Sequence, residues 1–222
     1  MIHMSERTKF DKLLIYSPLI VIIACSLLSI LFTSLLGVYA YIPVILIYWG
    51  ILALFIIIKK NTKSMVKRWL QPAKGNILWS IIPFFFVVMT LPMLIANWHF
   101  LANLEVLIPL IIFTAINPFM EEFFWRGLIL DTLEKRPFWA KVLYSSVIFT
   151  LIHPLVIGIF SIANRMVIFL FTTLFLSIIF AIVYIKTSSL RWLILAHLLL
   201  DFLGISTAVF LNYYIPEGLA LW

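Results

Sequence analysis

The chain has 222 residues, of which 64% are hydrophobic and only 11% are charged. Soluble globular proteins carry about 25% charged residues, so the composition excludes that class and indicates a membrane protein. The formal net charge is +7, but the basic residues lie between apolar stretches and form no basic domain, which excludes a nucleic-acid-binding protein. The single cysteine, Cys25, excludes an intramolecular disulfide and a cysteine-based zinc cluster.

Apolar stretches long enough to cross a hydrocarbon core of about 30 Å recur along the chain. The first stretch is too long for a signal peptide and lacks a small-residue cleavage pattern, so we treat it as a retained span. The predicted fold is therefore an all-α, polytopic transmembrane helical bundle of about seven spans that forms one domain over residues 1–222. The predicted spans cover about residues 13–36, 43–58, 77–96, 104–130, 142–160, 166–185 and 192–214.

The basic residues are distributed unequally between the two faces of this arrangement. Three precede the first span, six lie in 59–74, three in 135–141 and two between the last two spans, whereas the opposite face has only Arg165. The positive-inside rule therefore predicts a cytoplasmic N-terminus. Within 59–74, residues 65–70 could form an amphipathic helix against anionic lipid. Trp69 is one of several aromatic residues at span ends that fit an interfacial aromatic belt.

The fourth predicted span contains three ionisable side chains, Glu121, Glu122 and Arg126. A charged side chain at bilayer depth costs at least about 2.5 kcal/mol, so such residues mark functional sites. On a helix, Glu122 and Arg126 lie one turn apart and can form an ion pair, whereas Glu121 points about 100° away. We therefore expect a structural Glu122–Arg126 pair and a Glu121 carboxylate that is available for chemistry. Because Pro118 disfavours a helical conformation at the preceding residue, we expect Asn117 to cap a helix that begins at Pro118.

Two later spans carry the other intramembrane ionisable side chains. His153 lies in the fifth span, and His197 and Asp201 lie one turn apart in the seventh. At about 1.5 Å per residue, Glu121 is roughly 15 Å, His153 roughly 18 Å, and His197 and Asp201 roughly 8 and 14 Å from the cytoplasmic ends of their spans. These depths predict that the four side chains meet in the cytoplasmic half of the membrane.

Two carboxylates and two imidazoles can activate water in two ways. A carboxylate or a neutral imidazole can take a proton from water while other donors stabilise the oxyanion that forms when the water attacks a carbonyl. Alternatively, Glu121, His153, His197 and Asp201 could hold one divalent metal such as zinc with an open coordination position. The residues alone leave both alternatives open.

These residues resemble the motifs of the CAAX protease and bacteriocin-processing (CPBP, or ABI) family of intramembrane proteases. The family motifs are Glu-Glu-x-x-x-Arg, Phe-x-x-x-His and His-x-x-x-Asn/Asp on successive membrane helices. This sequence resembles these motifs, in the same order, at residues 121–126, 149–153 and 197–201. The resemblance covers about residues 105–205.

The resemblance implies an intramembrane endopeptidase that hydrolyses a membrane-associated peptide, either prenylated, as in CAAX processing, or leader-bearing. It implies that Glu121 and His153 activate the attacking water and that His197 and Asp201 stabilise the oxyanion. The supporting residues expected around them are Glu122, Arg126, Asn117 and Phe149.

Asp201 departs from the asparagine that many family members have at this position. A carboxyl group donates a hydrogen bond only when it is protonated, so Asp201 either carries a proton, orients His197 or ligates a metal. The family has been described as metal-dependent and as a metal-independent glutamate protease, and we favour the metal-free mechanism.

The expected setting is an integral membrane protein, in the plasma membrane if the source is bacterial, with its active site toward the cytoplasmic half. Its expected partners are the lipid bilayer and a membrane-associated peptide or protein substrate. The alternative function is a non-catalytic immunity or scaffold protein that binds a bacteriocin-like peptide or a membrane partner. An ion carrier is disfavoured because no second, related half with a broken helix is present.

Overall fold

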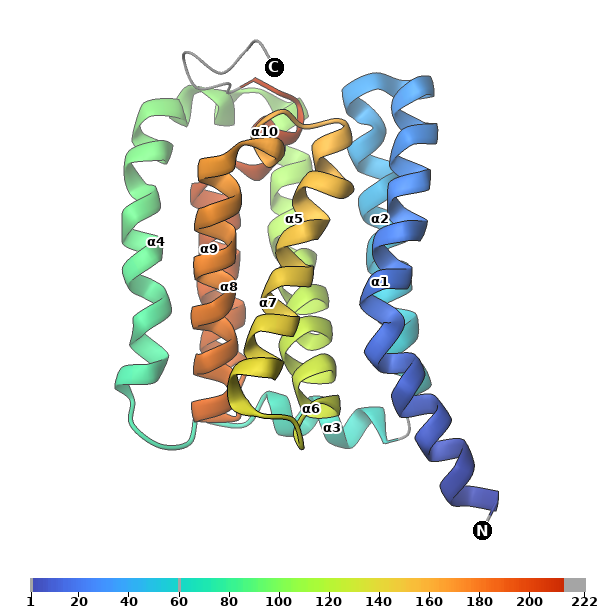
Figure 1. Ribbon diagram of the computed structural model, residues 1–222. Coiled ribbons are helices and arrows are strands. Elements are labelled where there is room, and N and C mark those ends of the chain that lie inside the picture. Colours follow the sequence, from blue (N-terminus) through green and yellow to red (C-terminus); the bar gives the residue numbers. More distant parts are fainter. Residues whose placement is uncertain (1, 60, 214–222) are drawn as a thin grey trace.

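The computed structural model describes residues 2–59 and 61–213, and these residues form an all-helical bundle (Figure 1). No strand occurs among them. The longer helices are α1 (Ile2–Leu36), α2 (Tyr41–Ile58), α3 (Thr62–Trp69), α4 (Leu78–Asn97), α5 (Leu104–Glu121), α7 (Phe138–Leu155), α8 (Val167–Thr187) and α9 (Arg191–Leu203). Shorter elements are the 3₁₀ turns η1 (Gly37–Ala40), η2 (Trp98–Ala102), η4 (Ile157–Ile159) and η5 (Ala163–Arg165), the π-helix η3 (Glu122–Ile129), α6 (Leu130–Thr132) and α10 (Ser206–Phe210).

Five stretches of the described chain are long and apolar enough to cross a membrane, and the first of them covers α1 from Leu13 onward and all of α2. The other four correspond to α4 with η2, α5 with η3 and α6, α7 with η4, and α8. Large apolar side chains cover the outside of the bundle; Leu35, Ile57 and Ile95 are 69%, 68% and 71% exposed. Such a surface suits lipid tails, which are as apolar as leucine. The predicted all-α membrane fold is confirmed, whereas the count of seven spans and the orientation stay predictions.

The seventh predicted span is not a single helix. Helix α9 ends at Leu203 after 13 residues, which is about 20 Å of helix. The backbone then turns at Gly204 and Ile205, and α10 follows. Ile205 has a φ of +48°, in the left-handed region that β-branched residues rarely adopt. The predicted end of this span at Tyr214 lies outside the described residues.

Helix α5 and its continuation η3 lie inside the bundle. Helix α5 packs against α2, α9 and α10, while η3 contacts α2, α3, α7 and α8. Helix α4 packs on α8 and α9 at one side, and α1 packs on α2 and α7 at the other (Figure 1). Residues on α5 and η3 can therefore meet side chains from helices on several sides.

The helix predicted at residues 65–70 corresponds to α3, which begins three residues earlier, at Thr62, and lies across one end of the bundle beside α6 (Figure 1). The expectation that Trp69 belongs to an interfacial belt is wrong, because its side chain is fully buried. Its Nε1 donates a hydrogen bond to Asp131 Oδ2 at 2.9 Å, and its carbonyl accepts one from the Leu190 amide at 2.8 Å. A Cβ atom at Gly127 would lie 2.7 Å from the Trp69 ring. Trp69 therefore packs against η3 and α6 at this end of the bundle.

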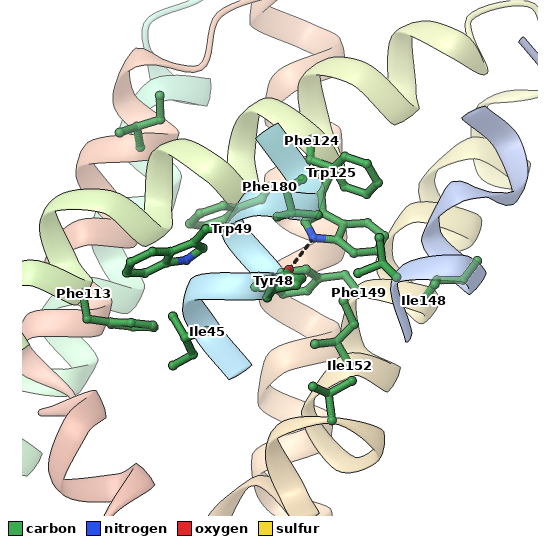
Figure 2. Packing of buried hydrophobic residues seen from close by; sticks show 14 of the residues in the cluster. Ile45, Tyr48, Trp49, Phe113, Phe124, Trp125, Ile148, Phe149, Ile152 and Phe180 are labelled. Atoms are coloured by element: carbon green, nitrogen blue, oxygen red, sulfur yellow. Dashed lines mark hydrogen bonds between the residues drawn. The ribbon is translucent and has the colours of Figure 1, made fainter. Parts of the chain in front are cut away.

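Aromatic side chains fill the centre of the bundle (Figure 2). The Trp125 ring packs edge-on against Phe149 at 5.7 Å between centroids, and its Nε1 donates to the Tyr48 hydroxyl at 3.1 Å. Trp49, next to Tyr48 on α2, packs on Phe113 at 5.9 Å. Buried indole and phenol groups need a hydrogen-bond partner, so this packing fixes their polar ends as well as their rings.

Candidate active site

The helix that carries the glutamate pair differs from the expected one. Helix α5 runs from Leu104 to Glu121 with Pro118 inside it and Asn117 in its interior. The prediction that Asn117 caps a helix starting at Pro118 is therefore wrong. Proline is tolerated within membrane helices when neighbouring groups satisfy the freed backbone. The departure from α geometry comes one residue after Glu121, where the π-helix η3 begins, and π-helical turns occur frequently at functional sites.

Glu122 and Arg126 form the expected ion pair within η3. Arg126 Nη1 lies 2.9 Å from Glu122 Oε1, and the two side chains are 2% and 0% exposed. Arg126 Nη2 also donates to Ser177 Oγ on α8 at 3.1 Å. The guanidinium carbon lies 4.5 Å from the centre of the Phe149 ring. These contacts tie η3 to α7 and α8.

His197 on α9 faces three carboxylates. Its Nδ1 lies 2.8 Å from Glu122 Oε1, while its Nε2 lies 3.5 Å from Glu121 Oε2 and 3.7 Å from Asp201 Oδ2. An ionised carboxylate only accepts hydrogen bonds, so Nδ1 carries the hydrogen that Glu122 accepts. The Glu122 contact therefore orients the ring and leaves Nε2 toward Glu121 and Asp201.

The two oxygens of Glu121 have different donors. The Tyr48 hydroxyl, on α2, donates to Oε1 at 2.9 Å, and Asn117 Nδ2 donates to Oε2 at 3.2 Å. Glu121 itself is 5% exposed. The carboxylate is therefore buried, with its plane fixed by one donor at each oxygen.

Asn117 also reaches Asp201. Its Nδ2 lies 3.2 Å from Asp201 Oδ2, and its Oδ1 accepts a hydrogen bond from Trp49 Nε1 at 2.9 Å. The other oxygen of Asp201 lies 3.5 Å from Ser206 Oγ. The turn at 204–205 places α10 so that Ser206 can make this contact.

His153 stands apart from this network. Its Nδ1 lies 3.3 Å from the Phe149 carbonyl oxygen, and its ring packs against Phe149 and Phe169 at 5.3 and 5.6 Å between centroids. A carbonyl only accepts, so Nδ1 is the donor, and Nε2 of the neutral ring is an acceptor. Within residues 2–59 and 61–213, no hydrogen bond or ion pair joins His153 to Glu121.

One cavity nevertheless connects the four side chains. It has a volume of about 420 Å³ and is lined by Glu121, His153, His197 and Asp201 together with Asn117. Most of its remaining lining is apolar and comes from α2, α4, α7 and α8. An apolar wall around a few polar groups strengthens the electrostatic interactions inside it.

The possible metal site at Glu121, His153, His197 and Asp201 stays a prediction. Among the described residues, no group of three or more His, Cys, Asp or Glu side chains could hold a metal ion. The Nδ1 atoms of His153 and His197 already face Phe149 and Glu122.

Sequence reasoning missed the contribution of α2. Tyr48 and Trp49 hold Glu121 and Asn117, yet they lie more than 60 residues earlier in the chain. Their position in the middle of an 18-residue apolar helix was the available signal, because tyrosine and tryptophan in membrane helices gather at the interfaces.

A family model described as type II CAAX prenyl endopeptidase Rce1-like matches residues 103–203. No curated protein and no solved structure matches the chain. The matched range contains all four cavity-lining ionisable residues and begins after α2.

Proposed function

Because this chain belongs to the CAAX protease family, whose Rce1-like model matches residues 103–203, we propose that it hydrolyses a peptide bond of a membrane-associated peptide through a water activated by Glu121. The family consists of intramembrane endopeptidases, and the chain is an integral membrane protein of that type. The observation that carries the proposal is the shared cavity, which Glu121, His153, His197 and Asp201 all line.

The first step of the proposed reaction is removal of a proton from water. Glu121 has both oxygens held by donors from Tyr48 and Asn117, and it retains lone pairs that can accept a proton from a water in the cavity. His153 presents an acceptor nitrogen to the same cavity and holds the other side of that water. The hydroxide equivalent then attacks the peptide carbonyl carbon.

The second step is stabilisation of the oxyanion and expulsion of the amine. His197 Nε2, protonated while Glu122 holds the ring through Nδ1, donates to the carbonyl oxygen as it becomes negative. Asp201, beside it, orients the ring. The proton taken up by Glu121 passes to the leaving nitrogen, which restores the carboxylate and completes the hydrolysis.

The substrate class and orientation are part of the same proposal. The largely apolar lining of the cavity favours a peptide that carries a lipid or an apolar leader segment. The end of the bundle that holds α3 and α6 (Figure 1) is flanked by the basic segments 59–74 and 135–141, and we assign it to the cytoplasmic side.

The test is cleavage of a fluorogenic peptide, with and without a prenyl group, by protein purified into detergent. Glu121→Gln should abolish turnover, because an amide cannot take a proton from water. Glu134→Gln is the matched control at an exposed carboxylate and should leave the rate unchanged. Normal turnover by Glu121→Gln would falsify the proposal and favour a non-catalytic binding protein.

Chelation separates the two mechanisms. For a metal-free reaction, activity should persist after incubation with phenanthroline and with EDTA. Loss of activity that added zinc restores would replace the glutamate mechanism by a metal-dependent one.

A further inference from the structure

The Asn117 side chain bridges two acidic groups of the cavity. Its Nδ2 lies 3.2 Å from Glu121 Oε2 and 3.2 Å from Asp201 Oδ2. The residue is 4% exposed, so water does not compete effectively for these contacts. A primary amide has two N–H hydrogens and can donate one to each carboxylate.

Trp49 determines which way this amide faces. The indole Nε1–H can only donate, and it lies 2.9 Å from Asn117 Oδ1. The oxygen must therefore face Trp49, and the amide hydrogens must face Glu121 and Asp201. The Trp49 ring is 7% exposed and packs on Phe113 (Figure 2), which holds the indole in place.

The site needs such a bridge because two carboxyl groups approach the same nitrogen. His197 Nε2 lies 3.5 Å from Glu121 and 3.7 Å from Asp201. Like charges in a poorly solvated pocket repel each other, and a donor shared between them offsets that repulsion. Displacing a reacting group by about 1 Å can cost about 100-fold in rate, so the relative position of these groups controls turnover.

We propose that Asn117, oriented by Trp49, is a positioning residue that holds the Glu121 and Asp201 carboxyl groups in a fixed arrangement around His197. This inference rests on the proposed function. It extends the catalytic assembly to α2, which lies outside the family-matched residues 103–203.

The decisive experiment exchanges the amide and the carboxyl group. Asn117→Asp removes both donors and adds a third acid, and its kcat should fall about 100-fold with KM within about twofold of wild type. Combining it with Asp201→Asn returns one amide and one carboxyl group to the contact, and kcat should rise at least about tenfold above Asn117→Asp. If Asn117 only filled space, no such recovery would occur.

Asn117→Ala removes the donors without adding charge and should also lower kcat. It covers the case in which Asn117→Asp does not fold.

Trp49→Phe tests the orienting contact, because it removes the indole N–H and keeps a ring. Its kcat should fall about tenfold. Trp98→Phe is the matched control, since Trp98 is 65% exposed, and should be unchanged. A kcat of Asn117→Ala equal to wild type, or an exchange variant no better than Asn117→Asp, overturns the inference.

A substrate-free measurement keeps the outcomes separate. In detergent, Asn117→Asp should lower the unfolding temperature, and Asp201→Asn should raise it in that background more than in the wild-type background. If no protein cleaves peptide while this coupling is present, the proposed function fails and the bridge stands. If wild type cleaves, Glu121→Gln does not, and the coupling is absent, the bridge fails and the proposed function stands.

Discussion

Replacing Arg126 by methionine should destabilise the protein strongly. The guanidinium makes the 2.9 Å ion pair with Glu122 and the 3.1 Å hydrogen bond to Ser177, and it is 2% exposed. Removing one partner of a buried ion pair costs about 3–5 kcal/mol, mostly because the other charge stays buried. His197 Nδ1 still contacts Glu122 after the change, so we expect a loss near the lower limit, about 3 kcal/mol.

The assay is reversible unfolding of the purified protein in mixed micelles with increasing SDS, followed by circular dichroism. Arg136→Met is the matched control at an exposed position and should change the free energy of unfolding by at most about 0.5 kcal/mol. Adding Glu122→Gln to Arg126→Met removes the stranded charge. The double variant should therefore be more stable than the sum of the two single losses by about 1–3 kcal/mol.

A free energy of unfolding of Arg126→Met within about 1 kcal/mol of wild type, a range typical of ordinary substitutions, would contradict a stranded buried charge at Glu122. Losses of the two single variants that add without coupling would contradict it as well. Either result would mean that Glu122 is solvated or protonated despite its burial.

Two glycine substitutions test the close contacts around the site. Gly127→Ala should destabilise by about 1–3 kcal/mol, because the new Cβ would lie 2.7 Å from the buried Trp69 ring; unchanged SDS unfolding would show that the Trp69 ring can move aside. Gly204→Ala should also destabilise, because its Cβ would lie 2.8 Å from the Leu200 carbonyl oxygen. The matched control is Gly50→Ala, which meets nothing within 4 Å and should stabilise the helix by about 0.5–1 kcal/mol; equal effects of the three changes would contradict the packing argument.

Local helical periodicity accounts for what could be predicted about the site. Residues four positions apart share a face, so the Glu122–Arg126 pair and the joint presentation of His197 and Asp201 followed from spacing alone. Matching depths along separate spans then predicted that Glu121 and the two histidines approach one another, and one cavity is lined by all of them.

The features that could not be predicted depend on contacts between distant segments. The rule for the residue before proline failed at Asn117, whose amide is held by Trp49 and two carboxyl groups. The burial of Trp69 could not be predicted, because it depends on close contact between its ring and Gly127, which lies far along the chain. The end of α9 was missed because Ile205 adopts a left-handed conformation that no propensity favours for isoleucine.

The π-helix η3 gives this segment a different phase from a regular helix. Its hydrogen bonds span five residues instead of four over Glu122–Ile129. Winding the same eight residues as a regular α-helix would rotate everything beyond them by about 100° relative to Glu121, because the π-helix accommodates one extra residue. Asp131 would then leave Trp69 and Tyr184, whose hydrogen bonds it accepts. A regular α-helix superposed on this segment can therefore match the position of Glu121 or that of Asp131, but not both in one register.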